Sequence, residues 1–345
     1  MSLSWIEALK NYIKLNSDTL LFLVLGLITF YLCINFSKDW EGYNFWYRTE
    51  AQEVSWKYFL HHYNPFREPL YKWVSKGISE IVGFTGFVLV ATVALLFIKL
   101  RFLGKIIDDP FVGTFFYMCL YLLLFEGTSI RIGYAVALIV LALYFLKQQR
   151  HLYFFLLIFI ASQIQLTALV FLVIYPLYFF RRLNWIVYLL FLLTPLLIIF
   201  DISLLNLLKQ VISSINPRYL DYYNIKPVNQ NSTGLYFYFI AFFSTILIAI
   251  YVFLKDKIEN DKFVTATYSM SLLGVISMCA FRDNVAVGAR LGELLLVTVV
   301  ILLSWLYKHF SERKMYAYQL TLGLGFIMYF CARFLYLYPT IFALG

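Results

Sequence analysis

Long runs of apolar residues, broken by short polar connections, recur along the whole chain. The runs lie at about 19–36, 81–99, 111–126, 131–146, 151–180, 185–200, 234–254, 263–281, 289–307 and 315–335. Most approach the ~20 residues that an α-helix needs to cross the hydrocarbon of a bilayer. Continuous runs of this kind predict membrane helices and exclude a barrel of short alternating strands.

One run is too long for a single crossing. Residues 151–180 carry a polar interruption, Ser162-Gln-Ile-Gln165, so we divide the run into helices at 151–163 and 166–180. Each is short for a full crossing and is expected to be tilted or partly re-entrant. With this division the pattern predicts an all-α, polytopic membrane protein with about 10–11 transmembrane helices.

Short basic connections predict the orientation of these helices, because lysine and arginine accumulate in cytoplasmic loops. Five basic clusters occur, at 99–105, 147–150, 181–182, 255–262 and 308–314. They share one side only if 151–180 crosses twice, which also makes the N-terminus cytoplasmic and the C-terminus external.

The other, external side then carries the short connections 126–131 and 282–289 and two longer loops. The loop at about 37–80 mixes charges with aromatic residues, which is typical of interfacial amphipathic helices. The loop at about 201–233 contains prolines and an asparagine-rich run, and we expect an irregular lid there.

Composition agrees with this picture. Mean hydropathy is +0.77, and 62% of the residues are hydrophobic while 14% are charged. These values exclude a soluble globular protein, so residues 1–345 are taken as one transmembrane domain. The net charge of +9 is assigned to the basic loops, since the chain has no nucleotide-binding loop or nucleic-acid motif. We therefore expect no nucleic-acid partner.

Arginines on the external side are the first functional candidates. Arg131 opens an apolar run, Arg282 and Arg290 flank a short connection, and Arg218 lies in the neighbouring loop. An ionisable residue at the mouth of a membrane helix marks a functional site by default. The guanidinium fork matches phosphate oxygens and stays charged, which favours binding of a diphosphate at headgroup level. The alternative is that these arginines snorkel, or pair with nearby acids.

Three carboxylates are candidates for a general base. Glu68 precedes Pro69 at a predicted helix start, and Glu126 and Asp283 lie near the external arginines in the sequence. The adjacent histidines His61 and His62 lack the spacing of metal ligands, and no D-x-D or H-E-x-x-H pattern is present. We expect neither a metal nor a cofactor.

Four places in the chain carry the pattern of a known family. The first holds Asp39-Trp-Glu-Gly-Tyr43 and Arg67-Glu-Pro-Leu-Tyr71; the others are Ser129-Ile-Arg131-Ile-Gly-Tyr-Ala-Val-Ala, Ala161-Ser-Gln-Ile-Gln165-Leu-Thr-Ala-Leu and Ala289-Arg-Leu-Gly-Glu293. In this order, over about residues 39–295, they resemble the EpsG/Wzy-like family of polysaccharide polymerases. The chain departs from the family at Gln165, where histidine is frequent. Glutamine forms hydrogen bonds but does not accept a proton at neutral pH, so Gln165 is a binding candidate only.

The resemblance implies a membrane glycosyltransferase with a GT-C-like architecture. It would join undecaprenyl-diphosphate-linked oligosaccharide units at the external face of the bacterial inner membrane. Capsule, O-antigen of lipopolysaccharide and exopolysaccharide stay open as products, and a chain-length-regulating co-polymerase stays open as a partner. The catalytic candidates are Arg131, Arg290, Glu68 and Asp283. The substrate-binding candidates are Arg282, Arg218, Asp39, Tyr43, Arg67, Tyr71, Glu126 and Gln165.

Two other functions fit the same pattern. One is a membrane glycosyltransferase that adds a single sugar from a polyprenyl-phosphate donor, with Asp39 and Glu41 as its acidic pair. The other is a flippase of lipid-linked oligosaccharide. Transporters of that kind often contain internal repeats, which we do not detect in this chain.

Overall fold

The computed structural model describes residues 3–37, 39–61, 68–200, 230–282 and 284–338. These residues form helices and connections and contain no strand. In the described part of the chain, eight helices are long and apolar enough to cross a membrane. Three shorter apolar helices accompany them, at Pro110–Glu126, His151–Ile164 and Leu166–Phe179. The prediction of an all-α, polytopic membrane protein is confirmed.

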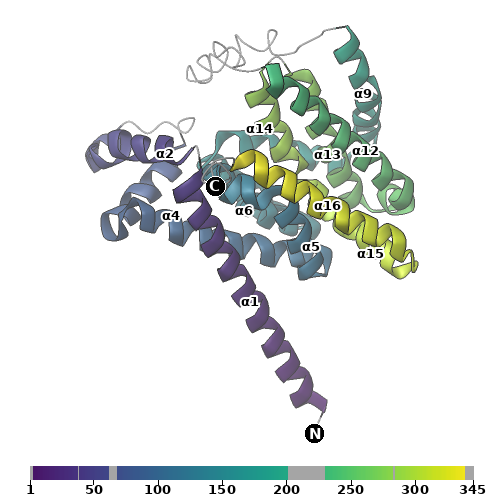
Figure 1. Ribbon diagram of the computed structural model, residues 1–345, viewed down its shortest axis with the longest axis horizontal. Coiled ribbons are helices and arrows are strands. Elements are labelled where there is room, and N and C mark those ends of the chain that lie inside the picture. Colours follow the sequence, from purple (N-terminus) through teal and green to yellow (C-terminus); the bar gives the residue numbers. More distant parts are fainter. Residues whose placement is uncertain (1–2, 38, 62–67, 201–229, 283, 339–345) are drawn as a thin grey trace.

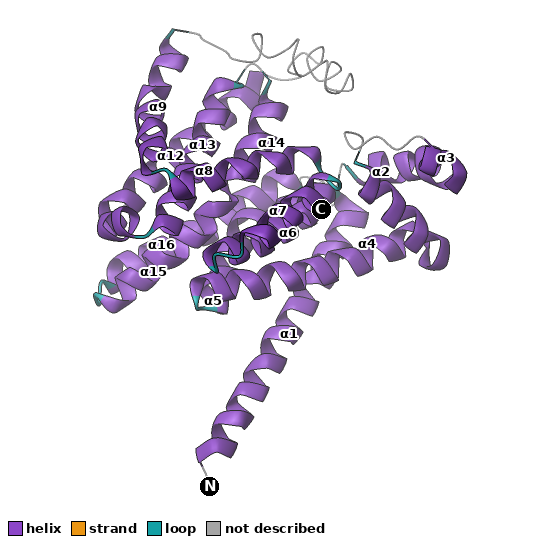
Figure 2. Ribbon diagram, turned by 180° about the vertical axis from the view of Figure 1, so that it is seen from behind, coloured by secondary structure: helices purple, strands orange, loops and turns teal. Residues whose placement is uncertain are grey.

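The first half of the bundle is built around α4. Its elements are α1 (Leu3–Phe36), α4 (Pro69–Ile107), α5 (Pro110–Tyr117), the π-helix η3 (Met118–Glu126), α6 (Ile130–Lys147) and α7 (His151–Ser162). Helix α4 packs against α1, α5 and α6, and α6 also packs against α7. The N-terminal part of α1 projects away from the bundle (Figures 1 and 2). We call the end of the bundle where α4 and α6 begin the Arg131 end.

The second half surrounds α13. Its elements are the 3-10 helix η4 (Leu166–Val173), α8 (Ile174–Phe179), α9 (Arg181–Ile199), α12 (Gln230–Asn260), α13 (Lys262–Ala280), α14 (Val285–Leu295), η5 (Leu296–Thr298), α15 (Val299–Glu312) and α16 (Tyr316–Leu337). The predicted division of 151–180 is confirmed, because α7 ends at Ser162 and η4 begins at Leu166.

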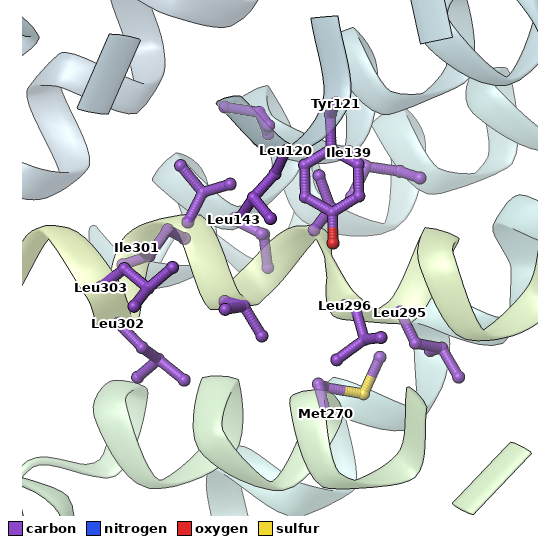
Figure 3. Close-up of a cluster of buried hydrophobic side chains, with 14 of the residues drawn as sticks. Leu120, Tyr121, Ile139, Leu143, Met270, Leu295, Leu296, Ile301, Leu302 and Leu303 are labelled. Atoms are coloured by element: carbon purple, nitrogen blue, oxygen red, sulfur yellow. The ribbon is translucent and has the colours of Figure 1, made fainter. Parts of the chain in front are cut away.

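Apolar side chains fill the contact between the two halves. Figure 3 shows residues of η3, α6, α13 and α15 pointing into one buried cluster: Leu120, Tyr121, Ile139, Leu143, Met270, Ile301, Leu302 and Leu303. Helices in a bilayer gain little from the hydrophobic effect, so close packing has to hold them together. Gly274 shows this closeness, because a Cβ atom there would lie 2.7 Å from Cγ of Leu296.

The segment between α1 and α4 is largely helical, as predicted for the loop at 37–80. It contains α2 (Trp40–Trp46), the π-helix η1 (Tyr47–Gln52) and α3 (Trp56–His61). Our predicted start of the next membrane helix, at residue 81, requires correction, since α4 begins at Pro69. Gly83 explains the difference: its φ of 74° and ψ of 164° break α4 into an outer piece and a membrane piece. Glycine adopts such a conformation at no steric cost.

Basic side chains gather at the end of the bundle opposite Arg131. Lys147 donates a hydrogen bond to the Ile106 carbonyl at 2.6 Å, and Lys308 donates one to the Ile107 carbonyl at 3.3 Å. Our assignment of Lys99 to the first basic loop cluster requires correction. It lies inside α4 with a fully buried side chain, and not in the loop that follows.

Candidate functional site

Arg131 and Glu68 form the centre of the site. Arg131 lies one residue into α6, and its Nη1 atom is 2.6 Å from Oε2 of Glu68. Glu68 directly precedes Pro69, the first residue of α4, and has left-handed backbone angles of φ 55° and ψ 54°. Such angles are costly for a residue with a side chain and often occur at functional sites. The fold therefore holds Glu68 in a strained position that faces Arg131.

The break between α7 and η4 joins this pair. Oε1 of Glu68 accepts a hydrogen bond from the Leu166 amide at 3.2 Å. The Gln163 carbonyl accepts from the first amides of α4, those of Leu70 at 3.1 Å and Tyr71 at 3.3 Å. Gln165, which is half-buried and extended, lies within the same break. Three segments that are distant in the sequence thus meet around one carboxylate.

Two tyrosines border the guanidinium. The Cζ atom of Arg131 is 5.8 Å from the ring centroids of both Tyr43 in α2 and Tyr71 in α4. Contacts of this kind are attractive when the cation is shielded from water. Both tyrosines pack with a cluster of buried aromatic rings that includes Phe84, Phe87 and Tyr134. The Arg131–Glu68 pair is therefore bordered by aromatic residues.

Two buried polar atoms at this site have no hydrogen-bond partner among the described residues. They are Nε of Arg131 and Oη of Tyr71. Buried polar atoms in folded proteins are nearly always paired, so each exception requires an explanation. Nε belongs to the guanidinium and the Tyr71 ring lies beside it, and both atoms can donate to an oxygen atom of a ligand.

Asp39, just before α2, and Arg290 in α14 extend the site. Asp39 precedes α2, and its carbonyl accepts from the Tyr43 amide at 3.0 Å. Burial raises the pKa of the Asp39 carboxyl, while the charges of Arg290 and Arg131 partly oppose this shift. Within the described residues, neither arginine forms a salt bridge with Asp39. Arg290 in α14 and Arg131 in α6 therefore influence the same carboxylate from a longer distance.

Arg282 is the other predicted external arginine that the structure describes. Arg282 donates a hydrogen bond to the Leu197 carbonyl of α9 at 2.8 Å, which connects it to the neighbouring helix. Three predicted site residues lie outside the described residues: Arg67, Arg218 and Asp283. The same holds for most of the loop at 201–233.

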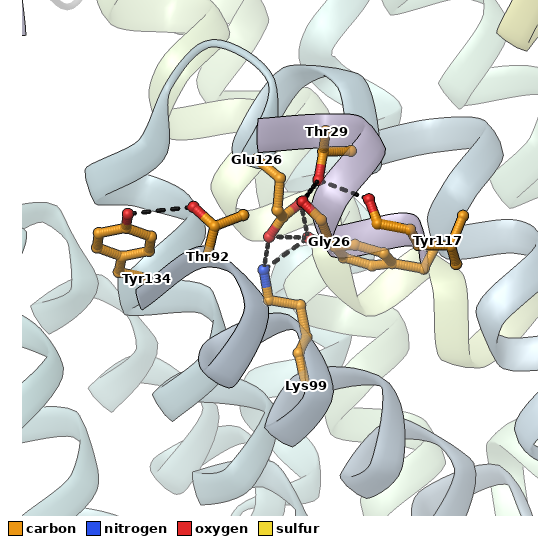
Figure 4. A network of polar contacts seen from close by, with 8 residues as sticks. Gly26, Thr29, Thr92, Lys99, Tyr117, Glu126 and Tyr134 are labelled. Carbon is orange, nitrogen blue, oxygen red and sulfur yellow. Dashed lines mark hydrogen bonds and ion pairs between the residues drawn. The ribbon is translucent and has the colours of Figure 1, made fainter. Parts of the chain in front are cut away.

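Glu126 belongs to a different, buried network. Its side chain is 2% exposed and forms an ion pair with Lys99, whose side chain is 0% exposed. Tyr117 donates to Glu126 at 2.9 Å, and Lys99 donates to Tyr117 at 2.7 Å (Figure 4). This burial corrects our assignment of Glu126 to the substrate-binding residues, because its carboxylate is turned into the bundle.

A second buried ion pair supports the helix that carries Arg290. Glu293, one turn after Arg290 in α14, pairs with Arg333 of α16, and Arg333 also donates to Tyr329. Sequence analysis assigned Lys99 to a basic loop and did not single out Arg333. Each lies in or at the end of an apolar run, and a cation inside a membrane helix predicts an acidic partner.

The fold and the site define a class: a polytopic helical membrane protein with an arginine–carboxylate site at one end of its bundle. The chain belongs to the EpsG family, whose sequence profile matches residues 18–343. Members of this family are Wzy-like polysaccharide polymerases. The match covers nearly the whole chain, confirms the resemblance seen in the sequence and supports a general role in polysaccharide polymerisation. No curated protein matches the chain, and no solved structure matches it.

Proposed function

We propose that this protein is a Wzy-type polymerase that joins undecaprenyl-diphosphate-linked oligosaccharide units. The observation that carries the proposal is the state of Arg131. It is oriented by Glu68 and bordered by two tyrosines, and within the described residues neither its buried Nε nor the hydroxyl of Tyr71 has a hydrogen-bond partner. A guanidinium with donors to spare suits the oxygens of a diphosphate.

The reaction would proceed by displacement at a sugar carbon. A hydroxyl oxygen of the acceptor unit attacks the anomeric carbon of the donor chain, and the bond from that carbon to the diphosphate breaks. The lipid diphosphate leaves with the electron pair, and the hydroxyl proton passes to a carboxylate. In this proposal Arg131 and Arg290 stabilise the charge that develops on the leaving diphosphate.

The contacts of the carboxylates suggest different roles for them. Both oxygens of Glu68 are engaged, one by Arg131 and one by the Leu166 amide, which favours a positioning role. Asp39 is half-buried, and its side chain forms no cap hydrogen bond with α2. We therefore favour Asp39 as the proton acceptor, and Asp283 stays a candidate outside the described residues.

We further propose that the Arg131 end faces the exterior of the bacterial inner membrane. This orientation follows from the lysines gathered at the opposite end, since basic loops are retained in the cytoplasm. The GT-C-like architecture and a co-polymerase partner also stay predictions. Arg282, Tyr43 and Gln165 stay candidates for substrate contacts.

The deciding experiment is a gel of surface polysaccharide from a deletion strain complemented with the wild type, Arg131→Ala or Arg313→Ala. Arg313 is an exposed arginine at the opposite end and serves as the matched control. We expect Arg131→Ala to leave one capped repeat unit and no ladder, at a normal protein level in the membrane. A normal ladder would contradict the proposal. Loss of every product, including the single unit, would place the block upstream and favour a single-sugar transferase or a flippase.

A further inference from the structure

An exposed tryptophan of α3 is held in a fixed orientation against the outer piece of α4. Trp56, the first residue of α3, is 41% exposed. Its Nε1 atom donates to both carboxylate oxygens of Glu80, at 3.0 and 3.3 Å. Gly77 lies against the ring, since a Cβ atom there would be 3.5 Å from the indole. The indole is therefore oriented by the fold and still accessible.

The charges around this indole are arranged unequally. Lys76 is buried, and its ammonium donates to the carbonyls of Ala51 at 2.8 Å and Gln52 at 3.3 Å. The ammonium also lies 3.5 Å from Glu80, whose side chain is 49% exposed. The Lys76 ammonium is thus directed into the protein, whereas the Glu80 carboxylate lies at the surface.

Trp46 and Trp56 lie beside successive lysines of α4, and Trp46 is the nearer to the Arg131 site. Lys72, Lys76 and Glu80 follow one face of α4 at four-residue spacing. Trp46 lies 5.8 Å from the ammonium of Lys72, and Trp56 lies 5.7 Å from that of Lys76. The Trp46 ring is also 5.3 Å from the ring of Tyr71, which borders Arg131. From Tyr71 to Glu80 the helix rises about 14 Å, enough for a short oligosaccharide.

We propose that Trp46, Trp56 and Glu80 form a track for the sugar rings of the growing chain. The proposal rests on the proposed function and adds to it where the saccharide lies beyond the reacting diphosphate. Flat indole rings offer apolar area to the C–H faces of sugars, and a nearby carboxylate accepts hydrogen bonds from their hydroxyl groups. A few placed polar groups among aromatic walls are the usual composition of a ligand site.

The contacts favour a saccharide over lipid headgroups. A tryptophan that anchors a protein at a membrane interface keeps its polar end in the wet interfacial layer. The N–H group of Trp56 is instead occupied by Glu80, and Lys76 is turned inward. The exposed carboxylate of Glu80 accepts hydrogen bonds from hydroxyl groups but offers no donor to phosphate oxygens. A neutral ligand rich in hydroxyl groups fits this surface better.

The test compares Trp56→Ala, Trp56→Phe and Trp185→Ala in nanodiscs. Trp185 in α9 is 59% exposed and distant in the sequence, and so controls for the loss of a surface indole. Polymerisation is measured with two donors, a lipid-linked single repeat and a lipid-linked chain of several repeats. We expect Trp56→Ala to raise KM for the longer donor roughly fivefold, with kcat little changed and the ladder shifted to shorter products. Trp56→Phe should retain most of the wild-type KM.

Two results would overturn the track. One is a Trp56→Ala enzyme that behaves like Trp185→Ala with both donors. The other is an equal loss with the single repeat and the longer chain, which would indicate a structural or membrane-anchoring role. If Trp56→Ala does not insert, Glu80→Ala decides by the same two donors. Arg131→Ala tests the proposed function separately, so an inactive Arg131 variant beside a normal Trp56 variant would remove only the track.

Discussion

Two ion pairs of this protein, Arg131–Glu68 and Lys99–Glu126, each join a cation to a carboxylate, but they differ in burial and in hydrogen bonding. The side chains of Lys99 and Glu126 are 0% and 2% exposed, and Tyr117 completes their hydrogen bonds. Those of Arg131 and Glu68 are 29% and 14% exposed, and Nε of Arg131 has no hydrogen-bond partner in the described part of the chain. An ion pair whose hydrogen bonds are all formed within the protein serves to hold helices together. An ion pair that keeps an unused hydrogen-bond donor can still bind a ligand.

The two pairs are connected through the backbone. Glu126 ends η3, and Arg131 follows five residues later at the start of α6. The Ser129 amide donates to the Leu124 carbonyl at 2.7 Å, and Tyr338 donates to the Leu123 carbonyl at 3.3 Å. The connection is therefore short and well bonded. We infer that the buried pair determines where α6 begins and so where Arg131 is presented.

The largest effect is expected from breaking the buried pair. Glu126→Ala leaves the Lys99 ammonium buried without a counter-charge, which costs about 3–5 kcal/mol. The double variant Lys99→Met with Glu126→Gln removes both charges and should recover most of that loss. Thermal unfolding in nanodiscs measures both. A double variant as unstable as Glu126→Ala would show that the pairing of charges does not decide stability at this position.

Arg131→Lys should separate catalysis from folding. Lysine keeps the charge but loses the planar fork of donors, so we expect polymerisation to fall by about 10²–10³-fold while the melting temperature stays near that of the wild type. The measurement is kcat/KM with lipid-linked repeats, with Arg313→Lys as the control. Full activity of Arg131→Lys would mean that the site needs only a positive charge.

Glu68→Gln should have a smaller effect. The amide can still accept from Leu166 but no longer balances the charge of Arg131. Because this pair is partly exposed, we expect a loss of about 1 kcal/mol or less in stability. Activity should fall about tenfold, mainly in kcat. A larger fall in stability than in activity would place Glu68 with the purely structural pairs.

The pH dependence should report on Asp39. Burial raises its pKa above the ordinary 3.8, and a proton acceptor must first be ionised. Activity should therefore fall as the pH is lowered through this raised pKa, and Asp39→Asn should remove that acid limb along with most activity. Stability has the opposite sign. The folded state favours the protonated carboxyl, so the contribution of Asp39 to the unfolding free energy decreases as the pH rises from 3.8 through the folded pKa. An unchanged acid limb in active Asp39→Asn would exclude Asp39 as the base.

Much of the helical framework was readable from the sequence because it depends on local properties. The length of an apolar run decides whether it spans a bilayer, and the polar residues 162–165 marked a real break. Arg131 and Glu68 were also identifiable, since a charge or an acid before proline stands out in an apolar context. The start of α4 was misplaced because the outer piece before Gly83 is amphipathic and not continuously apolar.

By itself, the sequence determined a helical membrane bundle and the residues eligible for a site at one of its ends. Only the tertiary structure decided which charges meet. Arg131 pairs with Glu68 across 63 positions, Glu68 reaches Leu166 across 98, and Lys99 pairs with Glu126 across 27. No local pattern separates the carboxylate that is buried from those that remain at the site, because burial depends on how distant helices pack. The same packing determines which donors are left unpaired for a ligand.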